Sequence, residues 1–414
     1  MSAHNRLPAF LLLAALRLPV CAQEANAGLS MPVTLTGGAL YTHRLQTGDL
    51  TASPIAAAFH AVLYPSLKLG PHWFVYSAID LRSTPFSYYD AYESEHDFKA
   101  QMLQAFLGYT RTIKKATVLV KAGQLTSAFG SFPLHYDDAD NPLLDQPLSY
   151  GTYLNLRPDQ LPCSGDDIIY GAQYATAVTH HCGGSTADRD GLTPVTLYGL
   201  PGVELDLSMR KVDARFQLTN SSPANPQNLL SRSQHGQWTA GAGYTVVQGF
   251  RVGFSAFRGP FLDRDVAPLL PAGQNVRDFP ATGAGVDAQW ARGRWSTSGE
   301  WQWFHYNYPG FHVSPAPSFA YAEVKAVLNP RTYLALRAGW QRNNHLVDLI
   351  ERTDETFAPN RQSYEFAAGF RPNRWQLLKV GYEWLRTTDV SGTRDNVFGI
   401  QLVTSLQPIS KAWR

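Results

Sequence analysis

Carboxylates are concentrated in one stretch of the chain, and four of them stand close together: Asp137, Asp138, Asp140 and Asp145. The surrounding segment 126–194 contains nine aspartates and only two basic residues, Arg157 and Arg189. Carboxylates that are held together attract cations and repel anions, as rings of aspartate do in cation channels. The same pattern also fits a solvated, turn-rich loop or a weak calcium site, so the stretch alone leaves three interpretations open.

The cysteines are the second group that could do chemistry. The chain has three, Cys21, Cys163 and Cys182, and the last two would remain after cleavage of an N-terminal leader. An exported chain meets an oxidising compartment, so we expect a disulfide between Cys163 and Cys182, with two free thiols as the alternative. His180 and His181 precede Cys182, but a disulfide would remove the thiolate that a metal needs. We therefore predict no metal and no cofactor.

Motifs for enzyme chemistry are missing from the sequence. It contains no Gly-x-Ser-x-Gly nucleophile motif, no phosphate-binding loop and no metalloprotease motif. No pair of serine and histidine stands out as a candidate for a membrane-embedded lipase. We assign no catalytic residues and expect that the protein is not an enzyme.

The first 22 residues have the form of a secretory signal. Arg6 precedes the apolar run Leu7–Leu16, and small or branched residues at Val20 and Ala22 suit a signal peptidase. The run is too short to span a membrane as a helix. We predict a signal peptide at 1–22 and one mature domain at 23–414; acylation of Cys21 as a lipoprotein is the alternative.

The composition of the mature chain indicates a membrane barrel. Aromatic residues make up 12% of the sequence and glycine is abundant, with 33 residues, yet mean hydropathy is slightly negative. After the leader no stretch approaches the roughly 18 apolar residues of a spanning helix, and only helices and closed barrels satisfy backbone groups within lipid. Removing Arg6 and Arg17 from 35 basic residues leaves 33 against 33 acidic ones, so nothing suggests nucleic acid as a partner.

Sixteen segments alternate apolar and polar residues in the manner of β-strands. They are Val33–Leu45, Ile55–Leu69, His72–Arg82, Phe98–Thr110, Ala116–Leu125, Val203–Met209, Val212–Asn220, Gln237–Val246, Phe250–Arg258, Ala281–Arg292, Arg294–Tyr306, Phe319–Leu328, Thr332–Arg342, Ser363–Arg371, Trp375–Arg386 and Asn396–Leu406. The connections between them are alternately short and long. An even number of strands with short turns at one end and long loops at the other is typical of an outer-membrane β-barrel.

The two faces of each strand differ in polarity. In Thr332–Arg342, Leu334 and Leu336 share one face, whereas Tyr333 and Arg337 share the other. Sixteen strands enclose a lumen too wide for side chains to fill. We therefore expect the polar face inside, against water, and the apolar face outside, against lipid.

The predicted inner face is almost neutral. By strand parity it carries ten basic residues and nine acidic ones. We take four of the basic residues as lumen cations: Lys68, Lys121, Arg215 and Arg337. Opposed charges of this kind resemble a general diffusion lumen, although mutual salt bridges that only stiffen the wall are the alternative.

Two short motifs carry a resemblance to a known family. Val120–Gly130 is similar to the stretch in which a porin strand ends and the long third loop begins, and Tyr198–Asp206 resembles the strand that follows that loop. The sequence looks like an outer-membrane porin and resembles the phosphate-selective porins and their relatives. Ala128 stands where proline is usual, and the chain ends in Arg414 where porins close on an aromatic residue. The row of arginines that would bind phosphate in that family is not recognisable in this sequence. We therefore do not predict phosphate specificity for this protein.

The resemblance implies a function. It implies that loop 126–202 folds inward and narrows the pore, which would place Asp137, Asp138, Asp140 and Asp145 at the constriction. We expect a Gram-negative outer-membrane channel for passive diffusion of ions and small hydrophilic solutes, surrounded by lipid and compatible with a homotrimer. The alternative is a barrel with a blocked lumen that acts as a structural protein, a receptor or an enzyme.

Overall fold

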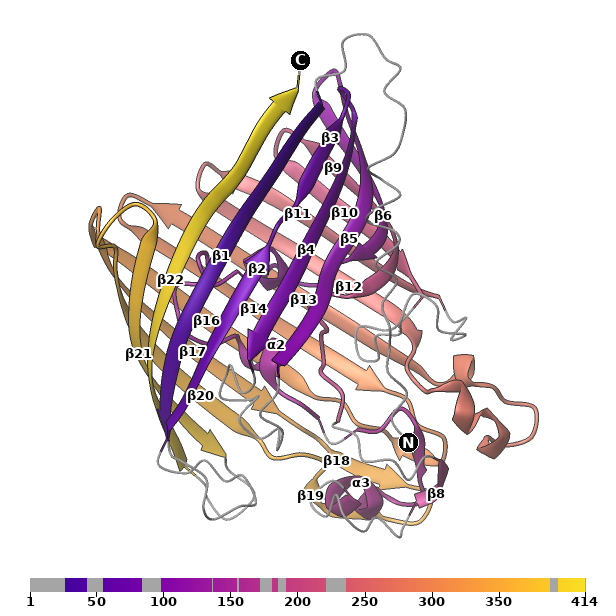
Figure 1. Ribbon diagram of the computed structural model, residues 1–414. Coiled ribbons are helices and arrows are strands. Elements are labelled where there is room, and N and C mark those ends of the chain that lie inside the picture. Colours follow the sequence, from indigo (N-terminus) through magenta and orange to yellow (C-terminus); the bar gives the residue numbers. More distant parts are fainter. Residues whose placement is uncertain are drawn as a thin grey trace.

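The main sheet of this protein closes on itself into a barrel of sixteen antiparallel strands, as the computed structural model in Figure 1 shows. The structure describes residues 27–42, 55–83, 98–135, 137–154, 156–171, 181–184, 191–220, 236–387 and 394–413. The first strand, β1 (Ala27–Thr42), pairs with the last, β22 (Arg394–Trp413), along almost its whole length. This pairing leaves the barrel without an open edge.

Each strand pairs with its neighbours in chain order. After β1 come β2 (Ile55–Leu63) and β3 (Ser66–Leu69), which share one position, then β4 (Trp73–Ser83), β5 (Phe98–Ile113), β6 (Ala116–Leu125), β9 (Leu200–Met209), β10 (Val212–Thr219), β11 (Gln237–Val247), β12 (Phe250–Pro260), β13 (Pro280–Arg292), β14 (Trp295–Tyr306), β16 (Ser318–Asn329), β17 (Thr332–Arg342), β20 (Arg361–Phe370), β21 (Gln376–Thr387) and β22. All sixteen predicted strands are confirmed, and two of them, Ala116–Leu125 and Thr332–Arg342, have the predicted ends. The predicted signal peptide 1–22 lies outside the described residues.

Two prolines explain where pairing is interrupted within the strands. Proline has no backbone N–H and cannot donate to a strand ladder. The register between β1 and β22 shifts at Pro32, and Pro65 separates β2 from β3 within one predicted strand. Beyond Pro32, β1 continues back to Ala27, which pairs with Trp413, so both terminal strands are longer than the alternation pattern indicated.

The short turns lie together at one end of the barrel. Gly249 in the β11–β12 turn has a φ of 83° and Gly293 in the β13–β14 turn has a φ of 62°, a left-handed conformation that glycine adopts without strain. The long loops emerge at the other end and carry their own structure. They contain η3 (Phe132–Leu134), α2 (Leu148–Gly151), β7 (Gln160–Pro162), α3 (Gly165–Gly171), β8 (His181–Gly184), η4 (Arg264–Leu269), η5 (Val276–Asp278), β15 (Phe311–Val313), β18 (His345–Asp348) and β19 (Arg352–Thr356).

Figure 1 shows α3, β8, β18 and β19 grouped beyond the loop end, with the end of β22 at the opposite pole. No helix within the described residues is both long and apolar enough to cross a membrane.

The predicted facing of the strands is confirmed by burial. On β17, Leu336 is 47% exposed and the next residue, Arg337, is only 3% exposed. On β20 the same contrast separates Phe366, at 46%, from Glu365, at 2%. Apolar side chains therefore cover the outside of the barrel and charged ones face its interior. This is the reverse of a soluble barrel and fits a lipid surround.

Aromatic side chains gather near both ends of the outer surface. At the loop end Tyr364 lies between Trp340 and Trp384, with ring centroids 6.5 Å and 5.3 Å apart. At the short-turn end the rings of Trp73 and Tyr109 are 4.8 Å apart. Two such belts are expected where a barrel meets the two interfaces of a bilayer.

The outer face predicts how the protein responds to a charge placed on it. Leu336→Arg, in the middle of β17, should destabilise the folded barrel by about 2–4 kcal/mol, because a guanidinium would enter the hydrocarbon layer. Val247→Arg, at the end of β11, should cost about 0–1 kcal/mol because it lies near the interface. Urea titration of the protein in lipid vesicles measures both. Equal costs for the two variants would contradict the lipid-facing assignment.

Candidate functional site

The first part of the third loop, residues 126–135 and 137–150, runs through the interior of the barrel. At its start the backbone N–H of Gly130 donates to Ser255 Oγ on β12, at 3.0 Å. Further along, Asp137 accepts a hydrogen bond from Thr34 Oγ1 on β1, at 3.2 Å. Because β1 and β12 lie on opposite sides of the ring, a segment that contacts both must cross the lumen.

The first anchor of the loop is Glu300 on β14. Its Oε1 accepts hydrogen bonds from the Ser131 N–H at 2.9 Å, the Ser131 hydroxyl at 2.7 Å and the Phe132 N–H at 2.7 Å. The hydroxyls of Tyr150 and Tyr321 also donate to this carboxylate, at 2.7 and 3.0 Å. One buried carboxylate therefore satisfies several polar groups of the loop that would otherwise be unpaired.

Gly130 fits beside this anchor only because it has no side chain. Its φ is 77°, and a Cβ atom there would collide with the Tyr150 hydroxyl and with the Glu300 carboxylate. The Phe129-Gly130 end of the motif that carries the porin resemblance is thus the point at which the loop docks on the wall.

The second anchor is formed by Arg337 on β17 and Lys379 on β21. The Arg337 guanidinium donates to the backbone oxygen of Asp145 at 2.8 Å, and Lys379 Nζ donates to the backbone oxygens of Asp138 and Leu143 at 2.9 and 3.0 Å. Lys379 is fully buried. On the neighbouring strand β20, Glu365 accepts the N–H groups of Leu144 and Asp145. The wall charges here bind the loop backbone.

The third anchor joins the aspartates to β2 and the residue that follows it. His60 Nδ1 lies 3.0 Å from Asp138, and its Nε2 lies 2.7 Å from Asp80 on β4. Tyr64 donates its hydroxyl to Asp137. Burial by itself would raise the pKa of Asp138, but the hydrogen bond and the charge of His60 lower it below its usual value. Burial raises the pKa of Asp137.

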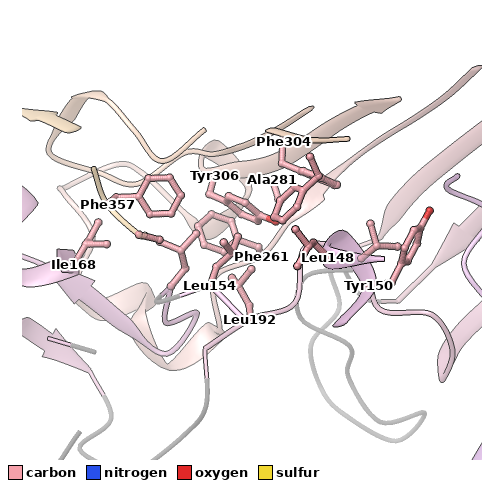
Figure 2. Close-up of a cluster of buried hydrophobic side chains, with 14 of the residues drawn as sticks. Leu148, Tyr150, Leu154, Ile168, Leu192, Phe261, Ala281, Phe304, Tyr306 and Phe357 are labelled. Carbon is pink, nitrogen blue, oxygen red and sulfur yellow. The ribbon is translucent and has the colours of Figure 1, made fainter. Parts of the chain in front are cut away.

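A large apolar cluster packs the remainder of the loop against the wall and the neighbouring loops. Figure 2 shows Leu154 and Leu192 from the third loop against Phe261, with Phe304 and Tyr306 of β14 close by. These five side chains are at most 4% exposed. The loop therefore closes part of the cross-section with a dry core, because apolar side chains at native packing density leave no room for water.

The inward-facing charges of β6, β9, β10 and β12 form what we call the open wall. They are Lys121, Glu204, Asp206, Asp213, Arg215 and Arg251. Lys121 Nζ lies 2.7 Å from both Glu204 and Asp206, and Arg251 lies 2.6 Å from Asp213. Lys121, Asp206, Arg251 and Asp213 keep 19, 21, 24 and 41% of their side-chain surface exposed. Water and ions can therefore reach this side of the lumen.

The four basic residues predicted to line the lumen have different positions in the structure. Lys121 lies on the open wall, Arg337 holds the loop, and Arg215 donates to the backbone oxygen of Gly130 at 2.9 Å. Lys68 lies apart from them, because it pairs with Phe74 next to the short turn between β3 and β4. Their role as pore cations stays a prediction.

The four aspartates have different surroundings. Asp137 and Asp138 are bound to the wall as described, whereas Asp140 is exposed. Burial, together with the negative charges of Glu383 and Glu365, raises the pKa of Asp145 well above its usual value. Of the four aspartates, Asp140 is therefore the best placed to act as a charge in the pore. The predicted role of all four as pore charges stays a prediction.

The cysteines lie in the outer part of the third loop. Cys163 is disulfide-bonded, and it follows β7, which pairs with the β8 strand that contains Cys182. The side chain of Cys182 lies outside the described residues, so its pairing with Cys163 remains the prediction from sequence. Among the described residues no group of three or more His, Cys, Asp or Glu side chains could hold a metal ion.

Sequence reasoning missed the anchoring residues. Glu300 and Lys379 are among the nine acidic and ten basic residues that strand parity places on the polar face, but nothing in their strands indicates that a loop distant in sequence binds them. His60 and Tyr64 were not singled out, although a histidine on the polar face of a strand is a usable signal for a lumen contact.

The first anchor can be tested directly. Glu300→Ala should free the start of the third loop, because it removes hydrogen bonds to a charged acceptor that contribute about 1.5–3 kcal/mol each. We expect faster limited proteolysis within residues 126–199, with the barrel still folded. Glu351→Ala, which removes an exposed carboxylate in another long loop, is the control. Equal proteolysis rates for both variants would refute the anchor.

The predicted Cys163–Cys182 bond gives a second test. Mass spectrometry of exported protein should show this disulfide, which closes a loop short enough to contribute about 3 kcal/mol in the chain-entropy account. Reduction should increase proteolysis of the third loop and leave the unfolding of the barrel unchanged, since the bond links no barrel strands. Two free thiols in exported protein would exclude the pairing.

Comparison with known proteins identifies the fold. No protein-family model matches the sequence, and none of the curated proteins does. Among solved structures, the channel DcaP of Acinetobacter baumannii is 11% identical with a TM-score of 0.53, covering 94% of this chain and 100% of DcaP. OmpF of Salmonella typhi, in complex with daunomycin, is 10% identical with a TM-score of 0.54, covering 91% and 97%. The anion-selective porin of Comamonas acidovorans is 8% identical with a TM-score of 0.51, covering 92% and 100%. At these identities the likeness shows the fold alone, and that fold is the one of outer-membrane porins.

Proposed function

We propose that the protein is a porin of the Gram-negative outer membrane, a water-filled channel for passive diffusion of ions and small hydrophilic solutes. The observation that carries the proposal is the open wall, whose charged side chains stay accessible inside a closed barrel with an apolar exterior. A barrel built only as a scaffold has no need of accessible charges inside it. We expect a homotrimer, which cross-linking in the membrane would test.

The third loop sets the size of the passage. It binds β14, β17, β20 and β21 and, further round the same side of the ring, β1 and β2. Its first residues also contact β10 and β12. The passage that remains runs along the open wall. A loop that narrows the lumen brings solutes close to wall charges, where bulk water screens them least.

Paired charges on the inner wall favour cations over anions. Lys121, Arg251 and Arg337 each lie between two carboxylates, and the six partners are Glu204, Asp206, Asp213, Asp287, Glu323 and Glu365. Each cluster therefore has one more acidic group than basic groups. The Arg337 cluster lies under the third loop, so the passage meets mainly the other two clusters, and with Arg215 of the same wall counted, four carboxylates (Glu204, Asp206, Asp213 and Asp287) stand against three basic groups (Lys121, Arg215 and Arg251). We propose a weak cation preference, and no preference for phosphate, because these basic residues are already paired.

A blocked lumen is the second candidate. It is favoured by the apolar cluster of the third loop, which packs without space for water against β14. Such a barrel would serve as a receptor, a structural protein or an enzyme. We assign no catalytic residue and no reaction to it.

Conductance separates the two candidates. Purified protein inserted into a planar bilayer should produce stepwise, ohmic current increases in potassium chloride, because the open wall offers a wet path. The Glu300→Ala variant should give larger or noisier steps, since its loop is less tightly held. Inserted protein, verified by its slower mobility on gels after boiling, that never conducts would favour the blocked barrel.

Selectivity tests the charged wall. In a potassium chloride gradient the zero-current potential should indicate weak cation preference, and Asp206→Asn/Asp213→Asn should shift it towards anions, because both carboxylates are accessible. Asp265→Asn, in an exposed loop, is the matched control and should not shift it. High salt should abolish the difference, since screening shortens the range of these charges to a few ångströms. Strong anion preference in the unaltered protein would refute the assignment.

A further inference from the structure

A row of aromatic side chains lies on the inner face of the barrel, next to the open wall. Its members, which we call the aromatic row, are Tyr64, which follows β2, Tyr76 and Phe74 on β4, and Phe106 on β5. The ring centroids of Tyr64 and Tyr76 are 6.5 Å apart, and those of Tyr76 and Phe106 are 5.3 Å apart. Those of Phe106 and Phe74 are 6.0 Å apart. The four rings therefore form one continuous row.

Strand alternation places these rings inside the barrel. On β4, Trp73 and Val75 are 47% and 39% exposed on the outer face, so the alternate residues Phe74 and Tyr76 face the lumen. On β5, Gly108 leaves room for the Phe74 ring, because a Cβ atom there would collide with it. The lumen of a porin is polar, so a row of rings on the inner wall departs from the usual pattern.

The row connects the third loop with the short-turn end of the barrel. At one end Tyr64 donates its hydroxyl to Asp137 of the third loop. At the other end Phe74 pairs with Lys68 next to the short turn between β3 and β4. Because β5 pairs with β6 of the open wall, the row borders the side of the lumen that the third loop leaves free. A solute that has passed the loop meets these rings on its way to the short-turn end.

The rings remain partly accessible. Tyr64, Phe74 and Tyr76 are only half-buried, whereas Phe106, at 8% exposed, packs among them as a support. The Tyr76 hydroxyl forms no hydrogen bond within the described part of the chain. The row thus offers ring faces and one free hydroxyl to a solute.

Charged groups that can bind hydroxyls lie beside the row. Lys121 Nζ is 5.7 Å from the centroid of the Phe106 ring, and both Lys121 and its partner Asp206 keep about a fifth of their side-chain surface exposed. Lys68, at the end of the row, is exposed and forms no ion pair among the described residues. Hydrogen bonds to charged groups of this kind are the stronger ones.

A cyclic sugar matches this combination. The faces of its ring carry C–H groups and are apolar enough to pack on aromatic side chains, while its hydroxyls project from the rim. Ligand sites commonly combine aromatic lining with a few placed polar groups in this way. A simple aromatic solute would use the rings and leave the charged groups unused.

We propose that the aromatic row binds the ring faces of sugars, so that the channel favours oligosaccharides among its solutes. Phe74 and Tyr76 stack on the sugar rings, and Lys121 and Asp206 bind hydroxyls at their rims. The inference rests on the proposed function, because a sugar reaches the row only through an open lumen.

Blockade of the ion current tests the row. A linear glucose oligosaccharide added to the full-length protein in a planar bilayer should reduce the potassium chloride current in a saturable manner. In Phe74→Leu/Tyr76→Leu the concentration that halves the current should rise by about tenfold, because two stacking rings are lost while apolar volume is kept. Tyr76→Phe keeps the ring and should keep most of the blockade.

The matched control removes two rings from the outer face of the same strands. Trp73→Leu/Tyr109→Leu deletes the ring pair whose centroids are 4.8 Å apart, and it should leave the blockade unchanged. An equal loss of blockade in this control would refute a role of the inner row.

Three further results would overturn the proposal. Equal blockade by polyethylene glycol of similar size would show that the oligosaccharide acts by volume alone. Equal blockade by benzyl alcohol at the same concentration would make the row a track for aromatic solutes. A barrel that conducts ions but shows no blockade by the oligosaccharide refutes the row and leaves the channel, whereas a barrel that never conducts refutes the channel and the sugar passage with it.

Discussion

Closure of the sheet through the pairing of β1 with β22 is the constraint on which the remaining structure depends. In hydrocarbon an unpaired backbone group has no water to bind, so a sheet can cross a membrane only as a closed ring. The register runs from Ala27 opposite Trp413 to Thr42 opposite Val397. This long seam makes the first and last strands of the barrel neighbours.

A ring of sixteen strands creates a second requirement, because its interior is too wide for wall side chains to fill. The third loop meets this requirement on one side of the lumen. Its backbone would enter the barrel with many unpaired polar groups, and the wall supplies their partners: Glu300 and Glu365 accept N–H groups, while Arg337 and Lys379 donate to carbonyl oxygens. The charges of Glu300, Arg337, Glu365 and Lys379 thus stabilise the loop, whereas Lys121, Asp206, Asp213 and Arg251 on the open wall remain available to water.

The barrel could be predicted from the sequence because the alternation of apolar and polar residues along a strand is a local pattern. Each strand carries its own pattern, as Leu336 beside Arg337 illustrates, and the sorting of short and long connections sets the topology. The ends of the strands were harder to predict where Pro32 and Pro65 interrupt pairing, since a proline changes the register without changing the polarity pattern. The contacts between the third loop and the wall could not be predicted. Glu300 and Ser131 are 169 positions apart in the chain, and no local sequence pattern indicates a contact between residues so far apart.

The aspartates of the third loop show that burial and bonding change how strongly a carboxylate acts on a solute in the passage. From the sequence, Asp137 and Asp138 stand out as a dense negative patch, yet both are bound to wall residues, Tyr64 and His60. The charge of Asp138 contributes little field to the passage, because a protonated His60 offsets it at close range. The hydroxyl of Tyr64 is neutral and does not offset Asp137, but burial raises the pKa of that carboxyl and so disfavours its charged form. The field that a solute meets is then set by charges without a full complement of partners. On the open wall and the adjoining β13 these are the four carboxylates that outnumber Lys121, Arg215 and Arg251. If the protein is a channel, as proposed, we expect its ion preference to be set by these strands, which looked neutral in the sequence alone.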